Sequence, residues 1–456
     1  MNTLLGPLQS LQNQLKVISD AEVDWKTIVV TFSLGVYFLE TYLLLRQYPL
    51  YNKTAPPPAL ATTFTPEVFD KSQKYGKDKA RFALFSSTFN QILEIAVIYF
   101  DLQVWAWSAA GALLNKYGYT GYEARCLHTM NIPQSIIFVT ILLLSNTVST
   151  LPLSLYQTFV LEEKHGFNKM TIGLFIVDTL KGWALGFVIG SPVLAAFLWI
   201  IRWAGDSFIP WLMSFLIAFQ LIMALATRLK FPLTDLYVID GSKRSAHSNA
   251  YFYGLPWSKH IVIYDTLIKQ SEPGEIEAVL AHELGHWSYS HPLKLLIVSQ
   301  LHLFLLLSAF PPFLKSSPLV ASFGYPPSVS KNPPTLVAFM LFQMILTPLE
   351  AIFGLAMNAL SRQFEWEADR FALELGHGSS PEDMDAHAKG SENSGDMGER
   401  LARALIGLHA ENLSTVWVDW LYSAYHHSHP TLTERLKAMD EYRAKVKIGY
   451  VSKKDL

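Results

Sequence analysis

Apolar runs of about 20 residues recur along the chain and constrain its fold more than any other feature, because a helix of about that length crosses the roughly 30 Å core of a bilayer. Most of these runs are apolar on every helical face, and 50% of the 456 residues are hydrophobic against 16% charged. This composition argues against one large soluble core. We predict a mainly α-helical, polytopic membrane protein with about seven transmembrane helices, over Thr27–Leu45, Ile92–Leu114, Ser135–Leu153, Gly182–Ile201, Phe208–Ala226, Leu293–Phe313 and Thr335–Leu360.

Lys and Arg are unevenly distributed between these candidate spans. The first, third and fifth connections carry seven, three and six of them, whereas the second, fourth and sixth carry two, one and two. Under the positive-inside rule this places the odd-numbered connections and the C-terminal tail in the cytosol, and the N-terminus on the other side. Charged residues at bilayer depth face protein or water, so a hydrated interior is indicated by Glu40, Glu94, Asp101, Asp178, His302 and Glu350.

Net charge and cysteine usage narrow the possible functions. The 36 Lys and Arg nearly balance the 38 Asp and Glu, so no basic excess exists to bind phosphate backbones and we expect no nucleic-acid partner. The single Cys126 excludes an intrachain disulfide and a zinc site of several thiolates. A metal site in this chain must therefore use histidine and carboxylate side chains.

The spans and the polar stretches between them divide the chain into four segments. Residues 376–398 are rich in Gly, Ser and acids and cannot bury enough apolar surface to order themselves, so we predict a mobile loop without chemistry there. The predicted segments are 1–226, with the first five spans; 227–291, with short strands and a helix; 292–360, with the last two spans; and 361–456, with a second helix, the loop and a cytosolic tail.

The connection between the fifth and sixth spans contains the motif HExxH, within SEPGEIEAVLAHELGHW at Ser271–Trp287. Ser271 can cap a helix whose apolar residues recur at helical spacing. On that helix His282 and His286 are four residues apart, so both imidazoles can share a metal while Glu283 reaches a water on it. We predict a zinc site here; two unrelated surface histidines are the alternative.

A catalytic zinc needs a third protein ligand and an open position for water. The strongest candidate lies on the helix predicted at Ser361–Gly376, where Glu365 and Asp369 are four residues apart on one face. We predict that Glu365 is the third ligand and that Asp369 accepts the free N–H of a ligand histidine. Glu367 lies on a different face and is a weaker ligand candidate. An ordinary surface acid paired with a neighbouring arginine is the alternative for Glu365.

Short strands are predicted ahead of the HExxH helix, which is the order of a small zincin-like α+β metalloprotease region. An edge strand beside the metal in such folds pairs with an extended substrate backbone. Downstream, His429 and Arg435 lie near a predicted helix start, where either could stabilise an oxyanion; a plain cap or turn role is the alternative. The predicted strands are Leu236–Asp240, Asn249–Gly254 and His260–Asp265.

These residues, together with several longer blocks, resemble the type 1 CAAX prenyl proteases, a family of integral-membrane zinc proteases also called farnesylated-protein converting enzymes. HExxH alone is shared by many metalloproteases, whereas the SNAYFYG and EKHGFN blocks are far more specific. The resembling segments spread over most of the chain: LPLSLYQTFVLEEKHGFNK at Leu151–Lys169, DGSKRSAHSNAYFYG at Asp240–Gly254, AHELGHW at Ala281–Trp287, SRQFEWEAD at Ser361–Asp369 and HSHPTLTERL at His427–Leu436.

The resemblance implies seven transmembrane helices around a large hydrated chamber, with one Zn²⁺ per chain at an active site that faces inward. It implies that His282, His286 and Glu365 are the zinc ligands and that Glu283 is the general base. It also implies an activity, which is the removal of the last three residues from proteins or peptides with a C-terminal prenyl-cysteine sequence. The resemblance also implies a second, N-terminal cut in a prenylated precursor.

The resemblance further assigns residues to substrate binding. Asn249 is implied to contact the substrate backbone, with Ala250 and Tyr251 beside it. His429 and Arg435 are implied to support the transition state or the ligand Glu365. We expect prenylated CAAX proteins or peptides and membrane lipid as partners of a monomeric chain.

The residues by themselves are compatible with two other functions. A site-2-type intramembrane protease would place HExxH inside a span and take an Asp from a later Asp-Gly motif, whereas here the helix precedes the span and Asp240-Gly241 precedes the helix. A membrane scaffold or quality-control factor would use zinc only as a structural element, and the intact Glu283 argues against that function.

The last four residues, Lys453-Lys454-Asp455-Leu456, predict a location. Lysines at the third and fourth positions from a cytosolic C-terminus form a dilysine signal, which a receptor binds to return membrane proteins to the endoplasmic reticulum. A merely solvated basic tail is the alternative. Because the charge distribution independently places this tail in the cytosol, we predict residence in the endoplasmic reticulum membrane, extending to the nuclear envelope.

Overall fold

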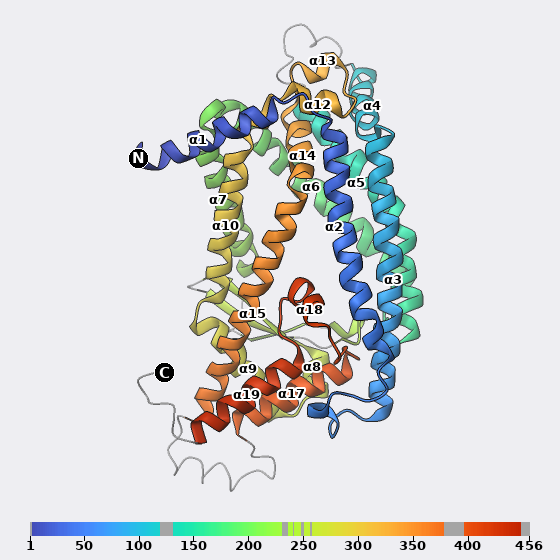
Figure 1. The fold of residues 1–456 in the computed structure, drawn as a ribbon, viewed down its shortest axis with the longest axis vertical. Helices are drawn as coiled ribbons and strands as arrows, with labels where there is room; N and C mark the ends of the chain where they lie inside the picture. The colour runs from blue at the N-terminus through green and yellow to red at the C-terminus, as the bar shows by residue number, and fades with distance from the viewer. Residues whose placement is uncertain are drawn as a thin grey trace.

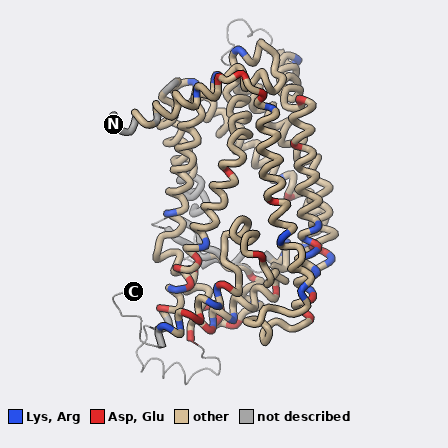
Figure 2. The backbone as a smooth tube through the Cα atoms, viewed as in Figure 1, with Lys and Arg blue, Asp and Glu red and all other residues tan. Residues whose placement is uncertain are grey.

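The computed structural model describes residues 2–118, 131–229, 236–239, 241–247, 250–255, 258–377 and 396–447. Figure 1 shows long helices running along the longest axis of the molecule, with a group of shorter helices and a small sheet gathered at one end. Figure 2 shows that Lys, Arg, Asp and Glu concentrate at that same end and are sparse along the long helices. The apolar helices and the charged end are thus separated along one axis, as a membrane protein with a water-exposed region requires.

Five described helical stretches are long and apolar enough to cross a membrane: Trp25–Asn52, Pro66–Tyr99, Ile132–Glu162, Ile172–Ala204 and His291–Ala309. Helices α14 (Thr335–Ile345) and α15 (Thr347–His377) together make a sixth if the bent pair is one span. The predicted span Phe208–Ala226 falls in α7 (Phe208–Leu229), where the apolar stretch among the described residues is the shorter Phe208–Gln220. The described part of the chain is therefore polytopic, and the count of seven stays a prediction.

The prediction of one continuous helix over Ile92–Leu114 is wrong. Helix α3 (Pro66–Tyr99) ends inside that range and α4 (Leu102–Lys116) begins three residues later. Asp101, between them, has a φ of 52° and accepts a hydrogen bond from Lys26 Nζ at 2.6 Å. A non-glycine residue seldom adopts that left-handed conformation unless its side chain is held by a partner.

The predicted helix over Thr335–Leu360 is also interrupted. Helices α14 and α15 meet at Leu346 and are bent by 63° relative to each other. Pro348, in the first turn of α15, has no N–H for the carbonyl four residues earlier and its ring crowds that carbonyl. The bend directs α15 toward the charged end of the molecule (Figure 1).

A three-stranded sheet lies at the charged end. Its strands are β1 (Leu236–Ile239), β2 (Ala250–Leu255) and β3 (Ser258–Tyr264), in the order β1-β3-β2. β1 runs parallel to β3, and β2 runs antiparallel to it with Tyr251 opposite Val262. The three predicted strands are present with slightly different ends, and β2 is one edge of the described sheet.

The HExxH helix is α9 (Pro273–Ser288). Its first turn is closed by a capping box in which the Glu275 carboxylate accepts the backbone N–H of Glu272 at 3.1 Å. Glu272 is therefore the N-cap, and the prediction that Ser271 caps the helix is wrong by one residue. The apolar face of α9 contributes Ala278 and Ala281 to a core shared with α15, α17 (Met397–Glu411) and α19 (Leu432–Lys447).

Helices α9 and α15 pack tightly against each other at Gly285. A Cβ added to Gly285 would lie 2.9 Å from the Cα of Ala368 and 3.1 Å from its carbonyl oxygen. Both of these atoms belong to the backbone and cannot rotate away. Only glycine therefore allows the two helices to cross at this distance.

We expect Gly285→Ala to lower the free energy of unfolding by about 1–3 kcal/mol, because the added methyl overpacks a helix crossing that cannot yield locally. Thermal unfolding of the detergent-purified protein measures the effect as a lower Tm. Gly354→Ala on α15 is the matched control, since a Cβ there meets no atom within 4 Å. Equal Tm values for the two variants would contradict the packing argument.

Candidate metal centre

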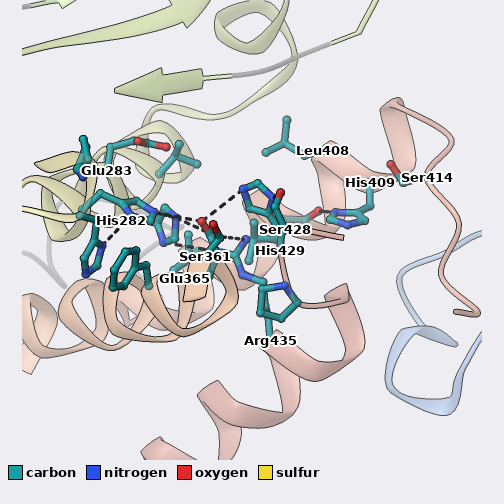
Figure 3. A pocket seen from close by; sticks show the side chains of 18 of the residues that line it. His282, Glu283, Ser361, Glu365, Leu408, His409, Ser414, Ser428, His429 and Arg435 are labelled. Atoms are coloured by element: carbon teal, nitrogen blue, oxygen red, sulfur yellow. Dashed lines mark hydrogen bonds and ion pairs between the residues drawn. The ribbon is translucent and has the colours of Figure 1, made fainter. Parts of the chain in front are cut away.

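Two helices bring three ligand side chains together. His282 and His286 lie one turn apart on α9. Glu365 projects from α15 toward His282 (Figure 3). The two Nε2 atoms are 3.2 Å apart, and the Glu365 oxygens lie 3.5 Å from His282 Nε2 and 3.3 Å from His286 Nε2. Tetrahedral ligands at 2.0–2.1 Å from a zinc-like ion are themselves about 3.3 Å apart. The predicted ligand set therefore has the spacing of one metal site.

Glu365 supplies an independent sign that a cation belongs at this position. Its Oε2 atom is buried and has no hydrogen-bond partner among the described residues. A buried carboxylate oxygen without a hydrogen-bond donor is costly, whereas a metal ion would satisfy it. Within the described part of the chain, His282, His286 and Glu365 form the one group of three such side chains close enough to hold a metal.

Asp369 lies where the sequence predicts it. Its Oδ1 is 2.9 Å from Nδ1 of His282, so the carboxylate accepts that N–H and leaves the Nε2 lone pair facing the metal position. Burial by itself would lower the pKa of His282, but the contact with Asp369 and the nearby Glu365 carboxylate outweigh it and raise the pKa to about 9. A metal must therefore displace a proton from this imidazole at neutral pH.

Arg435, on α19, lies behind the ligands. It is buried, its Nε donates to Asp369 at 2.8 Å, and its Nη1 is 3.5 Å from Glu365 Oε2. Of the two roles considered for Arg435, this geometry favours support of the ligands over contact with an oxyanion. Burial tends to lower the pKa of Arg435, but the two carboxylates raise it more, so this pKa lies above its usual value.

Glu283 and His429 face the metal position from the cavity. Both line a cavity of about 520 Å³ that also contains the three ligand residues. Burial raises the pKa of the Glu283 carboxyl, and the neighbouring His282 opposes the shift. His429 follows α18 (Trp420–His426), and its Nε2 lies 3.3 Å from Glu365 Oε1 (Figure 3). The pKa of His429 lies below its usual value because the surrounding cavity wall removes part of the hydration of the ring, although 64% of the side chain is exposed.

His291, which no pattern in the sequence singles out, is buried and links His286 to Glu367. The Nδ1 atoms of His286 and His291 are 2.9 Å apart, and His291 Nε2 is 3.0 Å from Glu367 Oε2. Because Nε2 of His286 faces the metal position, its Nδ1–H donates to His291, whose Nε2–H then donates to Glu367. No helical spacing signals this chain of contacts, because the helix breaks at Ser290, where φ is 55°. Glu367, the weaker ligand candidate, is engaged with His291 instead.

Of the three predicted substrate-binding residues, the structure describes two. Asn249 lies outside the described residues. Ala250 and Tyr251 begin β2, where their backbones pair with Ile263 and Val262 of β3. These two residues therefore lie on an edge strand of the described sheet.

Comparison with known proteins agrees with this geometry. Residues 47–229 match the family model described as CAAX prenyl protease N-terminal, five membrane helices, and residues 219–443 match that of peptidase family M48. CAAX prenyl protease 1 of Saccharomyces cerevisiae is 38% identical, over 95% of this chain and 99% of the yeast protein. The chain belongs to the CAAX prenyl protease 1 family.

A human homolog of CAAX prenyl protease 1 is 33% identical, over 90% of this chain and 94% of its own length. The crystal structure of Saccharomyces mikatae Ste24p superposes with a TM-score of 0.78 at 38% identity, covering 92% of this chain and 99% of that one. The chain is therefore a multi-pass membrane metallopeptidase with a Ste24p-like fold, as the sequence predicts.

We expect His291→Ala to weaken metal binding about 10- to 100-fold, because losing the group that orients a ligand histidine typically costs that much. Glu367→Ala should weaken it as well, and Glu367→Gln should do so less, since an amide oxygen still accepts from His291. The measurement is metal affinity by chelator competition on the purified protein. Glu374→Ala is the control, because Glu374 lies on the same helix but pairs with Arg370. Unchanged affinity in His291→Ala would exclude this orienting role.

Proposed function

We propose that the metal is zinc and that this chain removes the C-terminal three residues of prenylated CAAX proteins. The observation that carries the proposal is the buried Glu365 carboxylate facing two imidazoles, whose Oε2 accepts no hydrogen bond from the described residues, with Glu283 lining the same cavity. A His, His, Glu set that leaves one position open is typical of zinc peptidases. The substrate class rests on the relatives, which are named CAAX prenyl proteases.

The mechanism assigns a separate role to each side chain. A bound zinc ion would polarise the scissile carbonyl and lower the pKa of water beside it. The Glu283 carboxylate takes the proton of the attacking water and later delivers it to the leaving amine; burial raises its pKa, which suits both steps. His429 donates toward the oxygen that becomes negative in the transition state. Asp369 and Arg435 hold the ligands in place.

We propose that the substrate backbone pairs with the edge of β2, which begins at Ala250 and Tyr251, with Asn249 as a further contact. β2 is antiparallel to β3 and is an edge of the described sheet, so its outer N–H and C=O groups can add a strand. A second, N-terminal cleavage of a prenylated precursor would use the same centre.

A site-2-type protease is disfavoured by the position of the motif. α9 ends at Ser288, and the adjacent candidate span begins at His291 with α10 (His291–Ala309). The ligand histidines therefore precede the membrane helix. A scaffold with structural zinc would need no general base, yet Glu283 lines the cavity with both ligand histidines.

Two variants separate catalysis from metal binding. Glu283→Gln should keep one zinc per chain but lose cleavage of a prenylated CAAX peptide, because the amide cannot take a proton. Glu365→Ala should lose most of the zinc and therefore cleavage too. Zinc content and peptide hydrolysis are measured on the same preparations. Near wild-type cleavage by Glu283→Gln would contradict the mechanism, and zinc without hydrolysis in the unaltered protein would favour the scaffold.

We further propose that the chain is a lipid-embedded monomer of the endoplasmic reticulum membrane and nuclear envelope, with its C-terminus in the cytosol. The support is the dilysine pair Lys453 and Lys454, which lies outside the described residues, and the charge distribution between spans. Changing both lysines to Ser should move a tagged protein out of the endoplasmic reticulum. Unchanged localisation would remove the retrieval role, and a C-terminal tag protected inside sealed microsomes would overturn the topology.

A further inference from the structure

A second cavity, of about 870 Å³, borders the cavity of the metal centre. Figure 3 shows His409 and Ser414, two of the shared lining residues, beyond His429 as seen from Glu283. The second cavity therefore begins at His429, which is 3.3 Å from a ligand oxygen of Glu365. The residues that line both cavities are His409, Asn412, Ser414, Ser428, His429 and Pro430.

The charge of this second cavity differs from that of the metal centre. No Asp or Glu is among the described residues that line it, whereas Glu283 and Glu365 both line the first cavity. One permanently charged side chain, Lys79 of α3, faces it. The other titratable rings with a basic nitrogen are His247, His409, His426, His427 and His429.

Within the described structure Lys79 forms no direct ion pair, although its charge helps to lower the pKa of the nearby Glu162. Its Nζ lies 4.8 Å from the centre of the Tyr75 ring, and no ion pair to it is present. Glu162 is nearby, but its oxygens accept the Tyr75 hydroxyl at 2.9 and 3.0 Å and lie 3.6 Å from His247 Nε2. The ammonium group of Lys79 thus remains available to an anion in the cavity.

We propose that this cavity holds the three-residue leaving segment of the substrate and that Lys79 pairs with its C-terminal carboxylate. The inference rests on the proposed release of a tripeptide and adds the site that recognises the free chain end. Three extended residues span roughly 10 Å, and a lysine ammonium is a compact point charge that a carboxylate can meet from several directions. No carboxylate of the described residues lines the cavity itself, and the nearby Glu162 carboxylate is already engaged by the Tyr75 hydroxyl and by His247.

This arrangement would also select the bond that is cut. With its carboxylate held at Lys79, an extended tripeptide places the third peptide bond from the chain end, which joins it to the prenyl-cysteine, toward His429 and Glu365. A longer leaving segment would place its carboxylate at a different distance from the cut bond, and an internal segment has no terminal carboxylate. Lys79 is therefore a specificity residue, and it does not touch the reacting atoms.

The test compares two prenylated CAAX peptides that differ only in ending as a free acid or as a C-terminal amide. The unaltered protein should cleave the free acid with a kcat/KM about 10- to 100-fold higher, the usual effect of a hydrogen bond to a charged group. Lys79→Gln should lose this preference while cleaving the amide at an unchanged rate. Lys79→Arg should keep most of the preference. Lys74→Gln is the control, because Lys74 is on the same helix and pairs with Asp70.

Each outcome decides the inference. Loss of the preference in Lys79→Gln alone supports it, and the unchanged amide rate shows that the variant is folded and active. Equal cleavage of acid and amide by the unaltered protein would overturn the carboxylate site while leaving the proposed function intact. Equal loss on both peptides in Lys79→Gln would also overturn it. Failure of the zinc-loaded, unaltered protein to cleave either peptide would overturn the proposed function and this inference together.

Discussion

The structure depends on a small group of buried charges between α9, α15 and α19. Glu365 and Asp369 are both buried, and the Arg435 guanidinium, which lies between them, neutralises only one of the two. Buried charge is tolerated only when it is paired, and removing one partner is strongly destabilising. The remaining negative charge must be balanced by a proton on His282, whose pKa is about 9, or by a metal ion. A metal ion bound at the site would therefore also balance the charge that is buried between these helices.

The sequence predicted those features that depend on local spacing. HExxH on an apolar-faced helix, the Glu365 and Asp369 pair one turn apart, and the three strands are all encoded within a few residues of one another. The break at Asp101 was not predictable in this way, because it depends on Lys26, which lies 75 positions away in the chain. The contact between His291 and Glu367 was missed for the same reason, since these residues are 76 positions apart and meet only when α10 and α15 fold together.

The charged end and the membrane helices are joined by specific contacts. Arg46 of α2 (Trp25–Gln47) donates two hydrogen bonds to Asp419, the residue that caps α18, at 3.1 and 2.9 Å. From the other end of α18, the backbone carbonyl of Tyr425 accepts from Asn358 of α15 at 2.6 Å. α18 is thus held between two long apolar helices, and the loop that carries His429 continues directly from it. The position of His429 is fixed by the membrane helices as well as by its contacts at the metal centre.

The ligand set is divided along the chain, and this has a consequence for biogenesis. During synthesis His282 and His286 leave the ribosome well before Glu365, and the span at His291–Ala309 and the bent pair of helices must be inserted between them. Arg435 is made later still. Two imidazoles alone bind a metal ion weakly, so the full ligand set exists only once α15 packs against α9. Completion of the ligand set therefore requires that the membrane helices between its two parts have already been inserted.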